Sequence, residues 1–502
     1  MGLAVLGDPV GEAAKAPGLG LDDRPAIVGQ DFGGIFRERV DLGLGEVLTR
    51  EENMLVQSHV VILFVGRLLT PHRADAPPAV VSNAKGDSAG RHPTRPPLPE
   101  ARQNGKCGAM ATHLKSVDPK PDPLDGMSLP GWLYHDPEFF EAEKRAFLRA
   151  APQVVCHESE IAKAGEWRSL EYLGESVLVI RGDDGQIRAF ANVCRHRGSR
   201  LVDGEAGCAK VLTCPYHAWS YGRDGRLVGV PHRNEYPGLE PDKLGLAPVA
   251  LEAWHGFLFV TLEPGAPSVA EMMAPYADEV APYRFEDLRA IGRVTLRPRP
   301  LNWKTIADNY SDGLHIPVGH PGLTRLFGKN YKIEAREHVD RMEGDLGDKP
   351  SANPSERAYQ QYLPAVEQLP ASHRRKWIYY KLFPNVAFDI YPDQVDFMQF
   401  LPVSATETVI REISYAIPDE RREMKAARYL NWRINRRVNA EDTQLIARVQ
   451  AGMQSPAYVP GPLGTSEVCL RSFAQKLRRL IPEARLKRAP APGWLRANCG
   501  GA

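Results

Sequence analysis

The sequence of 502 residues has no long hydrophobic run and no excess of charge of either sign. Its longest uncharged apolar run, residues 60–66, is far shorter than the roughly 20 residues that a membrane-spanning helix needs. Lysine and arginine total 63 and aspartate and glutamate total 62, so the chain lacks the basic excess that attracts nucleic acid or an anionic membrane surface. We therefore expect no nucleic-acid partner and no membrane insertion.

Cysteine is also scarce. Seven cysteines, an odd number scattered over a long chain, do not form the dense pattern of a disulfide-stapled secreted protein. The N-terminus does not open with a charged segment followed by an apolar stretch and a cleavage site, as secretory signals do. We therefore expect a cytoplasmic protein in which some of the cysteines bind metal.

Aromatic residues are almost absent from the first quarter of the chain. Among 8 Trp, 17 Tyr and 16 Phe, those within the first 131 residues are only Phe32, Phe36 and Phe64. Residues 71–130 also contain eleven prolines. Such a segment buries too little apolar surface to offset its chain entropy. We expect residues 1–128 to be a disordered extension or the product of a translation start placed too far upstream, with a small extra domain as the alternative.

The remainder of the chain divides into a β-rich part and an α+β part. Charged residues alternate with Phe and Leu over residues 137–151, which predicts an amphipathic helix in a segment spanning 129–150. Short strand-like runs between Gly and Asp turns then predict a small all-β domain over residues 151–263. Residues 266–490 mix helices with longer strands and predict an α+β domain, followed by a flexible tail at 491–502. The expected strands include residues 176–180, 187–193, 210–213, 256–262, 387–391 and 408–416.

Two short motifs in the expected β domain carry candidate metal ligands. Cys194-Arg195-His196 and, after seventeen intervening residues, Cys214-Pro215-Tyr216-His217 each place one thiol and one imidazole on a tight loop after a strand. Together they offer two sulfur and two nitrogen ligands, which zinc accepts in tetrahedral structural sites. Zinc fingers usually pair cysteine with cysteine and histidine with histidine, whereas each loop here supplies one of each. The spacing therefore argues against zinc, which remains the alternative.

A second set of candidate ligands begins about a hundred residues further on. On a helix, Asp312 and His315 would share one face because they are three residues apart. Pro317 is expected to end that turn, so that His320 folds back beside His315. Two neutral histidines so placed could chelate one divalent ion. They lack the carboxylate that completes the two-His-one-carboxylate triad of non-heme Fe(II) oxygenases.

Asp442 is the candidate for that carboxylate. Apolar residues follow it at positions +3, +4, +7 and +11, so Asp442 shares the apolar face of its helix, whereas Glu441 sits off that face. A lone carboxylate directed into an apolar core is unfavourable unless a cation or a hydrogen-bond donor receives it. The alternative is an N-cap or a buried, hydrogen-bonded aspartate that binds no metal.

These motifs resemble the catalytic subunit of Rieske non-heme iron oxygenases, the aromatic-ring-hydroxylating dioxygenase family, over residues 130–490. Cys-x-His followed by Cys-x-x-His is similar to the family's iron–sulfur signature. The mononuclear-iron motifs have their counterparts in Asn302-Trp303-Lys304, in the stretch from Asn309 to Pro321, and in Glu441-Asp442 with a following Gln. Two mild departures are Asp312 and Leu314, where many relatives have Glu and Tyr.

The resemblance implies the ligands of a [2Fe–2S] cluster. Cys194 and Cys214 would be the thiolate ligands of one iron, and His196 and His217 the imidazole ligands of the other. Replacing two thiolates by neutral imidazoles removes negative charge and raises the reduction potential of such a cluster.

The resemblance also implies the mononuclear site. His315, His320 and Asp442 would bind Fe(II), and Asp312 would be the catalytic bridge between the iron-ligating histidine and a Rieske histidine of the neighbouring subunit. Such a bridge requires a ring of identical subunits, with a homotrimer as the expectation. The implied architecture is a Rieske β domain beside a helix-grip (START-like) α+β catalytic domain.

The implied activity is O₂-dependent hydroxylation, dihydroxylation or oxidative demethylation of a small molecule, with electrons from NAD(P)H delivered by a separate reductase or ferredoxin. An aromatic substrate, as in aromatic hydrocarbon catabolism, is the first expectation. A group of aromatic residues ahead of the Asp442 helix could instead cage a quaternary ammonium such as choline, carnitine or a betaine. The alternative, favoured for any single residue, is that it simply packs the sheet. The group comprises Trp377, Tyr379, Tyr380, Phe383, Phe388, Tyr391 and Phe397. The alternatives of another class are a Rieske electron carrier without catalysis and a zinc-stabilised interaction protein.

Overall fold

The computed structural model describes residues 122–499 of the chain. The interpretation of residues 1–121 as an extension lies outside these described residues. Residues 122–128, which the sequence places in the same extension, are held to the fold by Arg478, whose guanidinium donates to the carbonyls of Leu124, Met127 and Ser128. Within the described part of the chain, none of the helices combines the length and the apolarity needed to cross a bilayer.

The described fold begins with three short helical turns: η2 (Gly131–Tyr134), α2 (Pro137–Glu143) and the π-helical η3 (Lys144–Leu148). Asp136 caps α2 by accepting a hydrogen bond from the backbone N–H of Phe139 at 2.7 Å. Phe139 and Leu148 are fully buried against Trp303. This segment therefore packs with the helices of the α+β domain.

The β domain consists of short antiparallel strands in three small sheets. Its strands are β1 (Gln153–His157), β2 (Glu166–Tyr172), β3 (Glu175–Arg181), β4 (Ile187–Ala191), β5 (Ala206–Cys208), β6 (Leu212–Thr213), β7 (Ser220–Tyr221), β8 (Leu227–Gly229), β9 (Ala250–Trp254) and β10 (Phe257–Thr261). The strand orders are β4-β3-β2-β5, β6-β7-β8 and β1-β10-β9. Its 3₁₀ turns are η4 (Glu158–Ile161), η5 (Arg233–Glu235) and η6 (Pro241–Lys243).

An eight-stranded antiparallel sheet forms the centre of the α+β domain. Its strands are β11 (Arg289–Ala290), β12 (Thr295–Arg299), β13 (Tyr331–Ala335), β14 (Val339–Asp345), β15 (Lys376–Leu382), β16 (Val386–Ile390), β17 (Val395–Ser404) and β18 (Glu407–Ala416). They follow the order β11-β18-β17-β16-β15-β14-β13, and β12 also pairs with β18. Arg411 of β18 donates to the carbonyls of Val154 and Val155, which joins this sheet to β1.

The two faces of this sheet differ because side chains alternate along each strand. Tyr380, Phe388, Phe397 and Ile413 lie opposite one another on neighbouring strands and pack into one apolar core. The adjacent row consists of Tyr379, Asp389, Asp396 and Ser414, which therefore point to the other face. This polar row lies on the face that lines the cavity described below.

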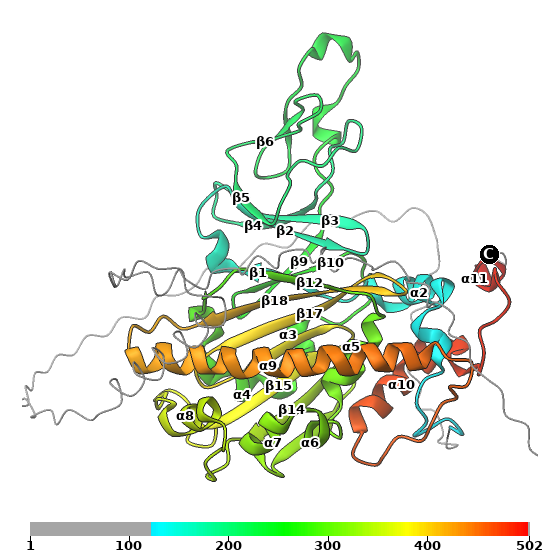
Figure 1. Ribbon diagram of the computed structural model, residues 1–502. Helices are drawn as coiled ribbons and strands as arrows, with labels where there is room; N and C mark the ends of the chain where they lie inside the picture. The colour runs from blue at the N-terminus through cyan, green and yellow to red at the C-terminus, as the bar shows by residue number, and fades with distance from the viewer. Residues whose placement is uncertain (1–121, 500–502) are drawn as a thin grey trace, which may run out of the picture. The chain divides into compact units, whose positions relative to one another are not determined.

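Helices on both faces of the sheet complete the domain: residues 269–288 pack into the apolar core with Tyr380 and Phe388, and the later helices cover the polar face (Figure 1). They are α3 (Val269–Met273), α4 (Ala277–Val280), α5 (Trp303–Ser311), α6 (Ile316–Gly319), α7 (Pro321–Phe327), α8 (Pro354–Tyr362), α9 (Arg422–Met453), α10 (Val468–Leu480) and α11 (Trp494–Cys499), with the 3₁₀ turns η7 (Ala274–Tyr276), η8 (Ala281–Tyr283), η9 (Phe285–Asp287) and η10 (Pro482–Arg485). The longest is α9, whose buried Leu430 and Ile434 pack with Trp377 of the sheet. In Figure 1 this helix runs across the sheet as a single orange ribbon.

The C-terminal segment expected to be a flexible tail contains α11 within the described residues. The carboxylate of Glu138 accepts hydrogen bonds from the backbone N–H groups of Gly493 at 2.6 Å and Leu495 at 3.1 Å. Trp494 is buried in the same core as α2. Helix α11 and these contacts thus extend the described fold past residue 490, the end of the expected catalytic domain.

Candidate metal centres

The two Cys–His loops of the β domain share one backbone design. Cys194 and His196 follow β4, and Cys214 and His217 follow β6. In each loop the carbonyl of the cysteine accepts a 3.0 Å hydrogen bond from the residue four positions later, which is Gly198 or Ala218. Both of these residues have positive φ, +77° for Gly198 and +55° for Ala218. A non-glycine residue in that region is uncommon, so the second loop holds a strained turn to reproduce the first.

The side chains of Cys194 and Cys214 are buried, and neither forms a disulfide bond. Both are therefore available as metal ligands. The hydroxyl of Tyr221 lies 3.3 Å from the Cys194 sulfur and accepts from the backbone N–H of Arg195. Burial raises the pKa of the Cys214 thiol, but hydrogen bonds from the backbone N–H groups of Tyr216 and His217 outweigh it and lower that pKa overall. A stabilised thiolate is the form that binds metal.

The two histidines of the loops face each other. Their ring centroids are 4.7 Å apart, and His196 stacks on Trp219 at the same centroid distance. Burial, followed by the neighbouring His196 and Arg197, lowers the pKa of His217, which keeps its imidazole neutral. Its Nδ1 is buried and has no hydrogen-bond partner among the described residues. An unpartnered buried nitrogen of a neutral imidazole is ready to ligate a metal.

The four loop residues fit a two-iron cluster better than a single zinc ion. In residues 122–499 there is one group of three or more His, Cys or carboxylate ligands whose atoms all lie within 4.8 Å of one another, and these loops do not form it. A tetrahedral zinc site would require all four ligand atoms to lie that close, since each bonds the ion at about 2.0–2.3 Å. Two thiols and two imidazoles in separate pairs match one ligand pair for each iron of a [2Fe–2S] cluster.

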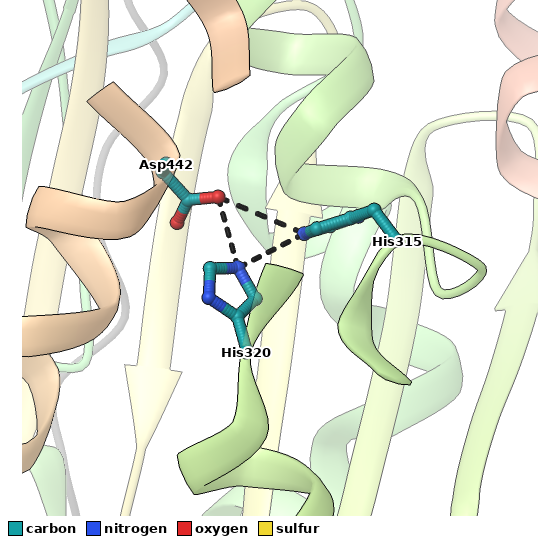
Figure 2. A group of neighbouring side chains, drawn as sticks. All are labelled: His315, His320 and Asp442. Atoms are coloured by element: carbon teal, nitrogen blue, oxygen red, sulfur yellow. Dashed lines mark hydrogen bonds and ion pairs between the residues drawn. The ribbon is translucent and has the colours of Figure 1, made fainter. Parts of the chain in front are cut away.

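His315, His320 and Asp442 form that one compact group (Figure 2). The Nε2 atoms of the two histidines are 3.1 Å apart, and Oδ1 of Asp442 is 2.9 Å from His320 Nε2 and 3.6 Å from His315 Nε2. Ligands that bond one ion at about 2.1 Å and at right angles have their atoms about 3 Å apart. The donor set and its spacing fit the facial triad of a non-heme Fe(II) ion.

The expectation that Asp312 and His315 share a helical face is wrong. Helix α5 ends at Ser311, Asp312 is its C-cap with extended backbone angles, and α6 begins only at Ile316. The two side chains still meet, because Asp312 folds into a turn around the backbone N–H groups of Leu314 at 2.8 Å and His315 at 3.2 Å. The hydrogen bonds of this turn therefore bring Asp312 and His315 together without a helix.

The expectation that Pro317 ends a helical turn is also wrong, because Pro317 lies at the start of helix α6. It occupies the first turn of α6, where its missing N–H leaves no intrahelical bond unmade. The backbone N–H of His320 then bonds to the carbonyl of Ile316 at 2.9 Å. This single helical turn brings His320 back beside His315, as the sequence predicts, but by a different local structure.

Helix α9 brings two consecutive carboxylates to His320. Asp442 lies inside this helix, which excludes the N-cap interpretation. Glu441, expected to sit off the relevant face, also reaches the site, and its Oε2 lies 3.0 Å from His320 Nδ1. Both side chains are 23% exposed, so neither is buried deeper than the other. The long Glu side chain compensates for its different angular position on the helix.

The carboxylate of Asp312 holds the ring of His315. Its Oδ2 lies 3.0 Å from His315 Nδ1, which fixes the tautomer that presents Nε2 to the ligand group. Burial raises the pKa of Asp312, but the hydrogen bonds from His315 and from the backbone N–H of Leu314 outweigh it and lower that pKa overall. Asp312 is therefore a stable carboxylate acceptor beside the triad.

A cavity of about 110 Å³ opens beside the triad and was not predicted from the sequence. Of the aromatic residues expected to surround a substrate, Tyr379 and Tyr391 line it, whereas Trp377 and Phe388 pack in the cores. The charged residues that line the cavity are Arg297, Arg299, Asp389, Asp396 and Glu412, in addition to Asp312 and Asp442. In the sequence, Asp389 and Asp396 are each the one charged residue of a largely apolar strand, whereas Arg297, Arg299 and Glu412 lie in strands with other charged residues and carry no such signal.

Two family models match the chain. The one described as "Ring hydroxylating alpha subunit (catalytic domain)" matches residues 285–483, and the one described as "Rieske [2Fe-2S] domain" matches residues 151–246. The oxygenase subunit of carnitine monooxygenase from Escherichia coli (strain K12) is 31% identical over 67% of this chain and 87% of its own length. Choline monooxygenase of Beta vulgaris is 27% identical over 69% of this chain and 75% of its own length.

A solved structure of the quaternary ammonium Rieske monooxygenase CntA with an inhibitor covers 70% of this chain and 95% of its own length, at 25% identity and a TM-score of 0.61. The predicted fold class, an all-β Rieske domain with an α+β catalytic domain, is thereby confirmed. So is the prediction of an enzyme that incorporates O₂, with a [2Fe–2S] cluster, a mononuclear iron and a separate electron donor. The electron-carrier and zinc-protein alternatives are wrong, because neither accounts for the matching catalytic domain. The chain belongs to the Rieske non-heme iron oxygenases, as a catalytic alpha subunit.

Proposed function

We propose that this chain is the oxygenase component of a monooxygenase that acts on a quaternary ammonium compound carrying a carboxylate. The relatives reported above are named for carnitine and choline, and a Pseudomonas aeruginosa relative, 32% identical over 46% of this chain, is named for glycine betaine. These substrates share a trimethylammonium group. The quaternary ammonium alternative is therefore better supported than the first expectation of an aromatic substrate, and aromatic hydrocarbon catabolism has no support from these relatives.

The observation that carries the proposal is a pair of buried carboxylates in the cavity. Asp389 and Asp396 lie directly opposite each other on β16 and β17, and each is 8% exposed. In the described part of the chain, no lysine or arginine forms an ion pair with either of them. Asp389 accepts hydrogen bonds from the hydroxyls of Tyr310 and Tyr391, and Asp396 accepts one from the Ser414 side chain and one from Gln394 at 2.9 Å.

These carboxylates are poorly stabilised without a cation. Burial raises the pKa of Asp389 to about 7 and that of Asp396 well above its usual range. Two like charges on directly opposed residues also repel each other across the sheet. A cationic headgroup in the cavity would remove both penalties, and the aromatic faces of Tyr379 and Tyr391 would receive its N-methyl groups.

An arginine in the same cavity supports a carboxylate on the substrate. In the region that the structure describes, the Nε atoms of Arg297 and Arg299 are both buried without a hydrogen-bond partner, but Arg297 is paired with Glu412 whereas Arg299 is paired with no carboxylate. Burial, assisted by Arg297, lowers the pKa of Arg299, so an anion would stabilise its charge. Its guanidinium also lies 3.4 Å from the hydroxyl of Thr443, the residue after Asp442. We therefore favour a carnitine-like or betaine-like zwitterion over choline.

The ligand assignments are part of this proposal. Cys194, His196, Cys214 and His217 would hold the cluster, and His315, His320 and Asp442 the mononuclear iron, which when bound supplies electrons and open coordination positions for O₂ activation. Asp312 would accept hydrogen bonds from His315 and from the neighbouring subunit's His217, which requires a closed ring of subunits. A homotrimer is the simplest such ring, and the electrons would come from NAD(P)H through a separate reductase.

The substrate proposal predicts a specific charge effect. Asp389→Asn and Asp396→Asn should each raise the KM for the zwitterionic substrate about tenfold, which corresponds to about 1.4 kcal/mol of lost cation stabilisation. In the wild type the KM should rise as the pH falls below about 7, because protonation of Asp389 removes the charge that faces the cation. Iron content and the Rieske spectrum should not change.

Turnover assays with a surrogate reductase test this. Carnitine and glycine betaine should be oxidised, choline more weakly, and aromatic acids not at all. Asp278→Asn is the matched control, since Asp278 is exposed and does not line the cavity. Oxidation of an aromatic acid without any quaternary ammonium turnover would contradict the proposed substrate class.

The cluster assignment makes its own prediction. His217→Ala removes the imidazole that the second loop supplies, so the visible absorption and the EPR signal of the reduced Rieske centre should both disappear. His232→Ala, at a strongly exposed histidine of the same domain, should leave both signals unchanged. A normal Rieske spectrum in His217→Ala would show that another residue holds the cluster.

A further inference from the structure

Both ring nitrogens of His320 are bonded to carboxylates, and the carboxylates belong to consecutive residues of α9. Nε2 faces Asp442 Oδ1 at 2.9 Å and His315 Nε2 at 3.1 Å, so this nitrogen points to the common centre of the triad. Nδ1 meets Glu441 Oε2 at 3.0 Å on the opposite side of the ring. A neutral imidazole that offers one nitrogen to a metal carries its proton on the other. The carboxylate of Glu441 is placed to accept a hydrogen bond from this Nδ1–H group.

We propose that Glu441 is a positioning residue for the mononuclear iron. Its carboxylate fixes His320 in the Nδ1–H tautomer and directs the Nε2 lone pair at the centre that His315 and Asp442 share. This inference rests on the ligand set of the proposed function. Glu441 is not itself a ligand, because it lies across the imidazole from the other ligand atoms. Carboxylates bonded to the distal nitrogen of a ligating histidine also make that imidazole a stronger base.

Arg437 holds Glu441 in this position. It lies one turn earlier on α9, and its Nε donates to Glu441 Oε1 at 3.1 Å. One carboxylate oxygen of Glu441 is thus held by the helix and the other by His320. A neighbour at i−4 on the same helix faces the same side, so no other element is needed to fix the carboxylate.

The partners of the two ligating histidines therefore differ in what else they can bind. Glu441 is already shared with an arginine, whereas among the described residues the donors to Asp312 are N–H groups of its own turn, those of Leu314 and His315. Asp312 can consequently accept one more donor from outside the subunit, and Glu441 is committed within it. Glu441 therefore sets the strength of iron binding, whereas Asp312 keeps the bridging role given to it in the proposed function.

Iron binding to protein stripped of its mononuclear iron tests this inference. In equilibrium dialysis against Fe(II) under anaerobic conditions, Glu441→Gln should bind about 10- to 100-fold more weakly than wild type. Glu441→Ala should be at least as weak, and Asp442→Asn should bind no measurable iron. Glu423→Gln is the matched control, because Glu423 is an exposed glutamate in the first turn of the same helix.

A second measurement separates positioning from a general loss of structure. With the cluster oxidised, and therefore silent in EPR, the nitric oxide adduct of the mononuclear Fe(II) reports the geometry of its ligands. Its signal should change in Glu441→Gln, and the Rieske absorption should not. Wild-type affinity and an unchanged adduct signal in Glu441→Gln, with iron lost in Asp442→Asn, would overturn this inference alone. Loss of iron in Glu441→Gln with full retention in Asp442→Asn would make Glu441 the ligand and overturn the proposed ligand set as well.

Discussion

His320→Ala and Asp442→Ala are each expected to remove about one iron per chain and to abolish product formation, while the Rieske spectrum stays intact. The three ligand atoms lie 2.9 to 3.6 Å from one another, so each residue supplies one of the three ligands of a compact site. Two remaining ligands cannot hold the ion in a facial arrangement with open positions for O₂. His320 is also 1% exposed, so water cannot easily replace its ring.

Iron and acid-labile sulfide analysis measures this effect directly. Wild type should contain about three irons and two sulfides per chain, and each variant about two of both. Asp278→Ala, at an exposed carboxylate far from the triad in sequence, should retain all three irons and full turnover. Three irons and normal product in His320→Ala would exclude this residue from the site. Full activity in Asp442→Ala with loss in Glu441→Ala would transfer the ligand role to Glu441.

The sequence is most informative where a site is built from one short contiguous loop. Cys194 and His196 are two residues apart, and Cys214 and His217 three, so their spacing almost determines how each pair can point. The strands expected at 387–391 and 408–416 also differ by only one residue at any end from β16 and β18, because β-branched and aromatic residues make up much of both segments. Local pattern and final structure agree at these positions.

Local structure around the mononuclear site was harder to predict. The sequence favours a helix through Asp312 and His315, but a carboxylate that can bond its own backbone competes with helical hydrogen bonds. Asp312 does so, and α5 stops one residue before it. For Glu441, the helical periodicity predicts the direction of the Cβ atom but not how far the side chain extends. The long side chain of Glu441 extends from a different face of the helix and contacts His320.

The cavity beside the triad could not be predicted from the sequence at all. Asp389 and Asp396 are opposed only because β16 and β17 pair in one particular register. Arg299 lines the same cavity because β12, near the start of the domain sequence, pairs with β18, which comes much later in the sequence. Such contacts depend on strand pairing that a single sequence does not specify. The charge of the cavity is a tertiary property, even though each of its residues is visible in the sequence.

Asp312→Asn is expected to stop electron transfer between the two metal centres without removing either of them. The two oxygens of Asp312 accept from three donors, which are the backbone N–H groups of Leu314 and His315 and the Nδ1 of His315. An amide offers one acceptor oxygen and one NH₂ donor, so one of these donors would face another donor. The variant therefore cannot hold His315 and also accept a hydrogen bond from the partner subunit's His217.

Stopped-flow spectroscopy resolves the step that should fail. The cluster of Asp312→Asn should be reduced at the wild-type rate, because His217 and its loop are unchanged. After mixing with substrate and O₂ it should be reoxidised at least about tenfold more slowly, with little product in a single turnover, since loss of one buried charged hydrogen bond costs about 1.5 to 3 kcal/mol. Asp345→Asn, at the end of β14 and outside the cavity, should behave as wild type. If Asp312 were only a carboxylate that caps its own turn, the variant would reoxidise and form product normally with both irons in place, and the bridge between subunits would have to be abandoned.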